Sequence, residues 1–161
     1  MKKSCIVTGG SSGIGQAIVK RFLDEGYEVT NLDLVAGEFG HHIPCDITEH
    51  DEVKTIIANV AKQRPIDALI CSAGIHVSAN IEDTSEQELM RVFDINVKGA
   101  YSAIQASLPS MKAARTGAIV LISSDQALVA KRNSFAYNLS KTALASMAKT
   151  TALDYAEYGI R

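Results

Sequence analysis

Tyr137 and Lys141 carry the most suggestive chemistry in this sequence, because a tyrosine and a lysine four residues apart share one face of a helix. A phenol that has lost its proton can act as a base, and a nearby ammonium favours that ionised form. Ser124 precedes Tyr137 by thirteen residues and directly follows a short apolar run, residues 118–123. If that run is a strand of a parallel sheet, Ser124 lies at the sheet edge where ligands bind. The alternative is a packed tyrosine beside a lysine whose ammonium reaches solvent.

A second candidate site is the glycine-rich segment at residues 8–15, between an apolar run and an amphipathic one. Gly9, Gly13 and Gly15 are spaced as GxxxGxG, not as GxGxxG. A strand, a glycine turn and a helix N-terminus in this order direct backbone N–H groups toward a phosphate. The segment therefore predicts a loop that holds a dinucleotide, with a tight structural turn as the alternative.

Asp33 ends the second apolar run, eighteen residues after Gly15. A carboxylate at this point accepts hydrogen bonds from the ribose hydroxyls of adenosine and repels a 2′-phosphate. Neither Ser12 nor Leu34 supplies a positive charge for such a phosphate. The pattern favours NAD over NADP. The alternative is a solvated aspartate that opens a loop.

The elements that must position these residues alternate along the chain. Strands are expected at residues 4–8, 27–33, 42–45, 68–71 and 118–123, each apolar on both faces or nearly so. Amphipathic helices are expected between them, including a long one at residues 85–111 and a last one from about residue 134 to 157. This order predicts an α/β fold with a three-layer, doubly wound parallel sheet of the Rossmann type, as one dinucleotide-binding domain over residues 1–161.

Two polar residues interrupt the apolar stripes of the predicted helices. Asn96 lies between Phe93 and Ala100, and Lys141 lies between Tyr137 and Leu144. Burying an amide or an ammonium is costly unless it finds partners, so both positions call for a functional or structural reason.

Four ordered segments together resemble the short-chain dehydrogenase/reductase family. They are residues 8–15, Asn96-Val97-x-Gly99, Ser123-Ser124 and Tyr137-x-x-x-Lys141, and the resemblance runs from the first strand to the last residue. It implies a catalytic tetrad of Asn96, Ser124, Tyr137 and Lys141. Tyr137 would exchange the proton of the substrate, Ser124 would bind the substrate oxygen, and Lys141 would hold the nicotinamide ribose. Asn96 would bend its helix and hold a water molecule that links Lys141 to solvent.

The resemblance also implies an NAD-dependent oxidoreductase that interconverts a secondary alcohol and its ketone, with no metal. The residues expected to bind NAD are Gly9, Ser11, Ser12, Gly13, Ile14, Gly15, Asp33, Asp46, Ile47, Ala73, Gly74, Tyr137 and Lys141. One alternative is a module that binds NAD without turnover, and a weaker one is a fragment that binds nothing.

Three features depart from the family pattern. Cys71-Ser72-Ala73-Gly74 stands where Asn-Asn-Ala-Gly is usual, so we expect less local rigidity. Asp125 and Gln126 follow Ser124 where small or apolar residues are commoner; they either face a hydroxyl-rich substrate or only border its pocket. The chain ends at Arg161, before the further strands of the family, so we expect an incomplete C-terminal end and an unpaired strand edge there.

The amino-acid composition limits the kinds of molecule that this chain is expected to bind. The 161 residues carry 16 Lys+Arg and 18 Asp+Glu, a net charge of −2, which argues against nucleic acid and membrane surfaces as partners. No apolar run is long enough for a membrane span, and three widely spaced cysteines suit buried thiols in the cytoplasm.

The two long helices carry Ala103, Ala106, Leu139 and Ala143 outside their expected core stripes, which predicts a homodimer or homotetramer built on them. Scattered alanines that only favour helix are the alternative.

Overall fold

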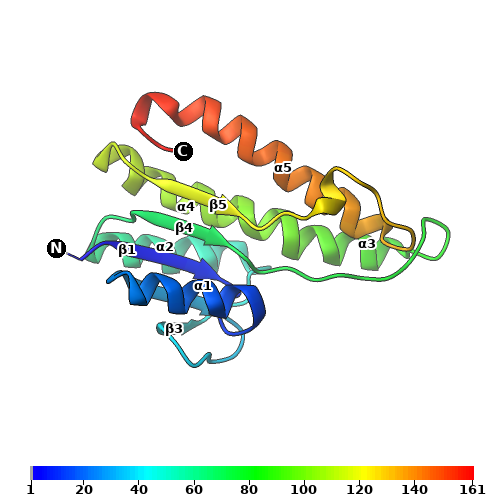
Figure 1. Cartoon of the computed structure of the whole chain (residues 1–161), viewed down its shortest axis with the longest axis horizontal. Helices are drawn as coiled ribbons and strands as arrows, with labels where there is room; N and C mark the ends of the chain where they lie inside the picture. Colours follow the sequence, from blue (N-terminus) through cyan, green and yellow to red (C-terminus); the bar gives the residue numbers. More distant parts are fainter. Residues whose placement is uncertain (1) are drawn as a thin grey trace.

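Five short strands form one parallel sheet in the computed structural model, which describes residues 2–161. The strands are β1 (Ser4–Thr8), β2 (Glu28–Asp33), β3 (His41–Pro44), β4 (Ala68–Cys71) and β5 (Ala118–Leu121). They lie in the order β3-β2-β1-β4-β5 (Figure 1). The chain moves outward from β1 to β3 and then crosses back to β4. The carboxyl ends of β1 and β4 therefore form the switch point at which open α/β sheets bind ligands.

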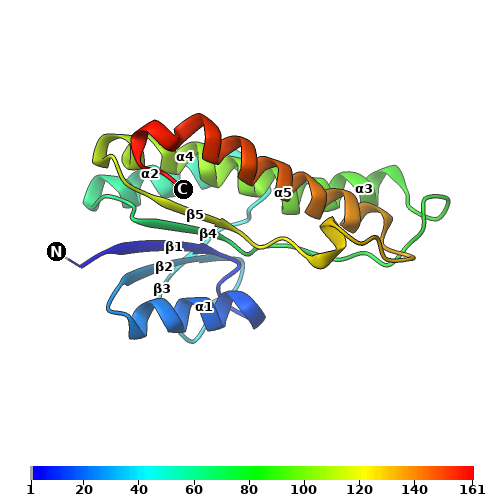
Figure 2. The same ribbon diagram turned by 45° about the horizontal axis from the view of Figure 1, so that its top comes forward.

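Helices cover both faces of this sheet. Figure 2 shows α1 (Gly13–Asp24) on one face and α2 (His50–Gln63), α4 (Gly99–Ala114) and α5 (Phe135–Tyr155) on the other. Every strand pairing is parallel, so between consecutive strands the chain returns to the same end of the sheet. The predicted three-layer Rossmann-type fold is confirmed. Among residues 2–161, none of the helices combines the length and the apolar character that crossing a bilayer demands.

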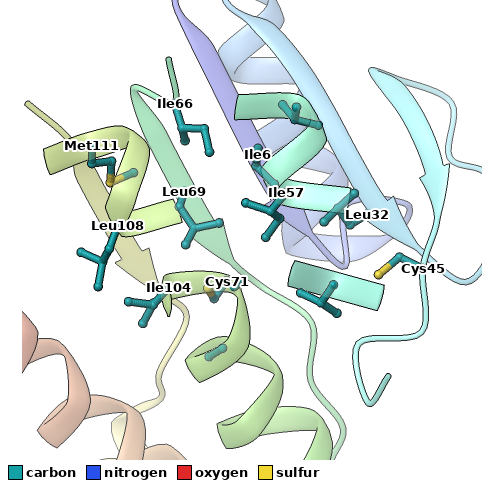
Figure 3. Close-up of a cluster of buried hydrophobic side chains, with 14 of the residues drawn as sticks. Ile6, Leu32, Cys45, Ile57, Ile66, Leu69, Cys71, Ile104, Leu108 and Met111 are labelled. Atoms are coloured by element: carbon teal, nitrogen blue, oxygen red, sulfur yellow. The ribbon is translucent and has the colours of Figure 1, made fainter. Parts of the chain in front are cut away.

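Two apolar clusters, one on each face of the sheet, hold the layers together. β1 contributes to both, because alternate side chains of a strand point to opposite faces. Ile6 joins the larger cluster, in which Leu69 of β4 and Met111 of α4 are also buried (Figure 3). Val7 joins the smaller cluster, with Val19 of α1. Full burial of such side chains contributes about 1.5–3 kcal/mol each, which fixes the central strands and the loops at their carboxyl ends.

β5 differs from the prediction in its length and in how far helices cover its faces. The strand ends at Leu121, not at residue 123, and Val120 is 45% exposed, because α1 packs on β1 and β2 on that face. The outer edge of β5 is also not fully unpaired. Ile119 N donates to Arg161 O at 2.8 Å, and Arg161 N donates to Gly117 O at 3.1 Å. The last residues of the chain thus begin a parallel pairing with β5.

The predicted helix at residues 85–111 is divided into three consecutive helical segments. α3 (Glu86–Phe93) leads into a π-helical turn, η1 (Asp94–Lys98), and then into α4. The predicted outer face was partly wrong, since Ala103, expected outside the core stripe, is fully buried, whereas Tyr101 is 50% exposed. α4 packs closely on α2 and β4, and this close approach admits a methyl group where a phenol ring does not fit.

Candidate active site

The glycine loop packs tightly against the strand beside it. It runs from Thr8, the last residue of β1, to Gly13, the first residue of α1. A Cβ atom at Gly9 would lie 2.6 Å from the Cα atom of Ala73 in the loop after β4, and one at Gly15 would collide with the carbonyl oxygen of Gly9. Gly13 has φ +51°, and no atom lies within 4 Å of its missing Cβ. Gly9 and Gly15 therefore permit close backbone packing, while Gly13 leaves open space beside the helix N-terminus.

The N-terminus of α1 opens into a cavity of about 490 Å³. Ser12 precedes the helix without a side-chain capping bond, and the first turn contains no acidic residue. The first N–H groups of a helix lack intrahelical partners and carry partial positive charge. Ser12, Gly13, Ile14 and Gly15 all line the cavity, and Ile14 is 63% exposed. This part of the cavity suits an anionic group such as a pyrophosphate.

Asp33 lines the same cavity from the carboxyl end of β2. Its carboxylate accepts hydrogen bonds from the backbone N–H groups of Ser11 at 3.0 Å and Val35 at 3.4 Å. The Ser11 hydroxyl donates to Val35 O at 2.6 Å and accepts from Asn31 Nδ2 at 2.9 Å. Ser11, predicted to bind the cofactor, is therefore engaged with β2 and the loop after it and does not line the cavity.

The other predicted cofactor residues come from two further strand ends. Asp46 and Ile47 follow β3, Ala73 and Gly74 follow β4, and all four line the cavity. Asp46 Oδ1 accepts hydrogen bonds from the N–H and the hydroxyl of Thr48, at 2.9 and 2.7 Å. These bonds hold the pKa of Asp46 below its usual value, so this carboxylate is ionised at neutral pH.

Tyr137 and Lys141 bring α5 into the same cavity. Lys141 is only 4% exposed, its Nζ donates to Ile122 O at 2.7 Å, and this atom lies 5.4 Å from the centroid of the Tyr137 ring. Burial lowers the pKa of Lys141, because the ammonium loses its hydration. A half-buried phenol thus lies beside a buried amine that is hydrogen-bonded to the chain just beyond β5.

Asn96 joins the loop after β4 to α5 from within the π-helical turn η1. Its Nδ2 donates to Ile75 O at 2.9 Å and to Ser140 Oγ at 3.0 Å, and its Oδ1 accepts from Ile75 N at 2.8 Å. The buried amide, 1% exposed, is therefore fully partnered by protein atoms. Because Ser140 directly precedes Lys141, these bonds also fix the helix turn that carries the lysine.

Ser124 lies beyond β5 and begins a short 3₁₀ turn, η2 (Asp125–Ala127). Its Oγ donates to Asp125 Oδ1 at 2.8 Å and accepts from Gln126 N at 3.2 Å. The neighbouring Ser123 Oγ donates to Lys141 O at 2.9 Å. Ser123 lines the cavity and Ser124 does not, so the structure places the predicted catalytic serine at its border.

His76 is a cavity residue that the sequence analysis did not single out. Its ring lies edge-on to Tyr137, with ring centroids 4.7 Å apart, and its Nε2 lies 3.0 Å from Ser134 Oγ. Its only sequence signal is a position two residues after Gly74. The loop that carries it runs beside the loop before α5, where Phe135 N donates to Ala79 O at 3.0 Å.

One cavity brings together most of the residues predicted to hold a dinucleotide. It joins the carboxylates of Asp33 and Asp46, the open space beside Gly13 and the Tyr137–Lys141 pair in one continuous lining. These are the groups that the sequence predicts beside ribose and adenine, pyrophosphate and nicotinamide. Among residues 2–161, no group of three or more His, Cys, Asp or Glu side chains could hold a metal ion.

The known proteins that are similar to this chain include enzymes named as dehydrogenases. The family described as short chain dehydrogenase matches residues 3–161. The chain is 34% identical to L-fucose dehydrogenase of Rattus norvegicus over 99% of its own length and 63% of that protein. The structure is similar to that of Thermoplasma acidophilum aldohexose dehydrogenase, with a TM-score of 0.94, 40% identity and coverage of 99% of this chain and 64% of the other. It is also similar to ElxO with NADP bound, with a TM-score of 0.94, 27% identity and coverage of 100% and 71%. The chain thus spans less than two thirds of the length of L-fucose dehydrogenase and of aldohexose dehydrogenase.

Proposed function

The chain belongs to the short-chain dehydrogenase family, and on this premise we propose that it interconverts a secondary alcohol and its ketone with NAD as the cofactor. The observation that carries the proposal is the single cavity shared by the glycine loop, Asp33, Tyr137 and Lys141. A nucleotide site and an acid–base pair in one cavity are what hydride transfer requires, because both reacting partners must be held together.

Four side chains in or near the Tyr137 end of the cavity have distinct tasks. When bound, NAD⁺ supplies the hydride acceptor for the carbinol C–H bond of the alcohol. Tyr137, as the phenolate, accepts the O–H proton, so the alcohol loses one hydride and one proton and becomes the ketone. Lys141 favours the phenolate while protonated and is positioned to hold the ribose beside the nicotinamide. Ser124 binds the substrate oxygen, and Asn96 positions Ile75 and the turn of α5 that carries Lys141.

Asp33 supports the choice of NAD over NADP. Its carboxylate lies in the cavity lining at the end of β2, where it accepts from ribose hydroxyls and repels a 2′-phosphate. The similarity to ElxO, whose structure holds NADP, means that the fold alone does not select the cofactor. The proposal therefore depends on the charge at this position.

We propose a polyhydroxylated substrate. L-fucose dehydrogenase and aldohexose dehydrogenase are both named for sugars, and two polar residues, Asp125 and Gln126, directly follow Ser124 in η2. An alcohol with neighbouring hydroxyls would find hydrogen-bond partners there that an apolar alcohol would not use.

We also propose that the chain self-associates through the outer faces of α4 and α5. A second proposal is that it is a protein of the cytoplasm. The predicted interface needs correction, because Ala103 is core and Ala106 packs against it; Tyr101 and Leu139, 50% and 43% exposed, are the apolar residues that remain on the surface. The cytoplasmic assignment rests on three free, buried cysteines, because thiols stay reduced in that compartment.

The decisive experiment follows NADH formation from NAD⁺ with a panel of secondary alcohols and polyols. We expect turnover by the unmodified chain and a loss of about 10²- to 10⁴-fold in Tyr137→Phe, with NADH binding retained by fluorescence. Tyr27→Phe, which removes a phenolic oxygen at the far end of β2, is the matched control and should stay active. Full activity of Tyr137→Phe would refute the role of Tyr137. NADH binding without turnover on any alcohol would identify a cofactor-binding module instead.

A further inference from the structure

We propose that Asp125 selects vicinal diols, by binding the hydroxyl next to the reacting one and thereby releasing Ser124 to bind the reacting oxygen. This inference rests on the proposed function, since it needs Ser124 at the substrate oxygen. It assigns to Asp125 both a contact with the substrate and the positioning of a neighbouring side chain.

The Ser124 hydroxyl is committed to Asp125 before any substrate arrives. A serine hydroxyl has a single proton, and Ser124 donates it to Asp125 Oδ1 at 2.8 Å. The oxygen also accepts from Gln126 N at 3.2 Å. While these bonds persist, Ser124 has no proton to donate to a substrate oxygen, so a ketone or an alkoxide-like oxygen cannot gain its stabilisation.

The bond to Asp125 is not needed for the local backbone. The 3₁₀ turn η2 is capped by the bond from Gln126 N to Ser124 Oγ, which uses the lone pair of the serine and leaves its proton free to point elsewhere. Asp125 is exposed and forms no salt bridge within residues 2–161. Its carboxylate can therefore exchange one hydroxyl donor for another without disturbing the turn or uncovering a cation.

A vicinal diol matches this pair of groups. Its two gauche hydroxyls lie about one hydrogen-bond length apart, as do Ser124 Oγ and Asp125 Oδ1. When the second hydroxyl of the diol donates to Asp125, the Ser124 proton turns to the first oxygen, and the number of hydrogen bonds is conserved or raised. An alcohol with one hydroxyl must break the Ser124–Asp125 bond and leaves the carboxylate without a replacement donor other than water. The diol therefore gains a charge-assisted hydrogen bond to the carboxylate that an alcohol with one hydroxyl does not make.

The test compares butane-2,3-diol, as each stereoisomer, with butan-2-ol. For the unmodified chain we expect kcat/KM for the best diol isomer to exceed that for butan-2-ol by about tenfold or more. In Asp125→Ala this ratio should fall by about tenfold, chiefly through a higher KM for the diol. Asp125→Asn keeps an acceptor oxygen in the same shape and should retain a larger part of the preference. Glu82→Ala removes an exposed carboxylate from the segment between β4 and α3 and should leave the ratio unchanged.

Several results would overturn the inference. Equal losses on both alcohols in Asp125→Ala would mean a structural role only, and an unchanged ratio would mean that the diol does not touch Asp125. NADH binding and the melting temperature are measured for every variant. If Asp125→Ala does not fold, the same ratio in Asp125→Leu decides, because leucine fills a similar space without an acceptor oxygen, and no loss there refutes the inference. Failure of the proposed function looks different, because the unmodified chain then oxidises neither alcohol.

Discussion

In the nucleotide half of the cavity, formed by the glycine loop with Asp33 and Asp46, backbone packs directly on backbone. In the tyrosine half, lined by Tyr137, Lys141 and His76, side-chain hydrogen bonds join separate elements. His76 pairs with Ser134, and Asn96, behind the cavity, bonds Ser140. The contrast extends to the surroundings of each half. Gly9 lies against Ala73 with no room for a methyl group, whereas Leu128 and Val129, just after η2, are 87% and 72% exposed.

The difference shows how one fold can keep its cofactor while its substrate changes. Where backbone atoms line the cavity, they offer the same N–H groups whatever the neighbouring side chains are. Such a lining tolerates almost no substitution at the glycines. A wall of side chains on exposed loops can be altered residue by residue without disturbing the core. Mutations in the two halves should therefore produce different kinds of loss.

The largest effect is expected in the nucleotide half. In Gly15→Ala the new methyl group would collide with the carbonyl oxygen of Gly9, and neither backbone can move without opening the loop. We expect at least about 3 kcal/mol of destabilisation in urea unfolding and loss of NADH binding. Gly26→Ala is the matched control, since no atom lies within 4 Å of its missing Cβ; only its positive φ of +82° opposes the change. Equal costs at the two positions would remove the argument from backbone packing.

Lys141→Met tests the tyrosine half by separating activity from stability. Methionine fills the same space without a charge, so we expect a loss of about 10²- to 10⁴-fold in kcat with little change in the fold.

The pKa of Lys141 is lowered in the folded chain from its ordinary value of 10.5, so between these two pKa values the unfolded state binds more protons. The free energy of unfolding of the unmodified chain should then rise with pH across that window relative to Lys141→Met. A difference that falls or stays flat over this range would contradict the assigned burial effect.

Two buried amides, one in each half, give a closer comparison. Asn96 makes three hydrogen bonds, whereas Asn31 makes one through Nδ2 and its Oδ1 has no partner within residues 2–161. At about 1 kcal/mol per hydrogen bond, Asn96→Ala should cost about 3 kcal/mol and Asn31→Ala about 1 kcal/mol in chemical denaturation. Only Asn96→Ala should also lower kcat, because it loosens the turn that carries Lys141. The reverse order of costs would mean that side-chain bonds do not hold the tyrosine half.

The smallest expected effect concerns cofactor choice. Asp33→Asn keeps an acceptor for Ser11 N and removes the charge, so the repulsion of a 2′-phosphate is lost while the loop stays in place. The ratio of NADPH to NADH affinity should rise by about tenfold in fluorescence titrations, which corresponds to about 1.4 kcal/mol. Tighter binding of NADPH than of NADH by the unmodified chain would show that Asp33 does not set the preference.

Periodicity and turn chemistry were sufficient to predict the fold. The strands at residues 4–8 and 68–71 were predicted to the residue, and the order of elements led to the doubly wound sheet, because each depends on neighbours along the chain. The family was likewise predicted from ordered motifs and is confirmed by the match over residues 3–161. The roles of Asn96, Ser124, Tyr137 and Lys141 stay predictions, although the cavity brings Tyr137 and Lys141 together.

Only the tertiary structure decided which atoms face the cavity and which are already hydrogen-bonded to other protein groups. It turned the Ser11 hydroxyl toward Val35, placed His76 against Tyr137, and buried Ala103, which was expected outside the core. His76 meets Ser134 across 58 residues of sequence, a pairing that no local pattern encodes. The spacing of residues along a chain determines which backbone turns and faces are possible. The partners of each side chain depend on how distant elements pack, and that packing is settled only when the whole core closes.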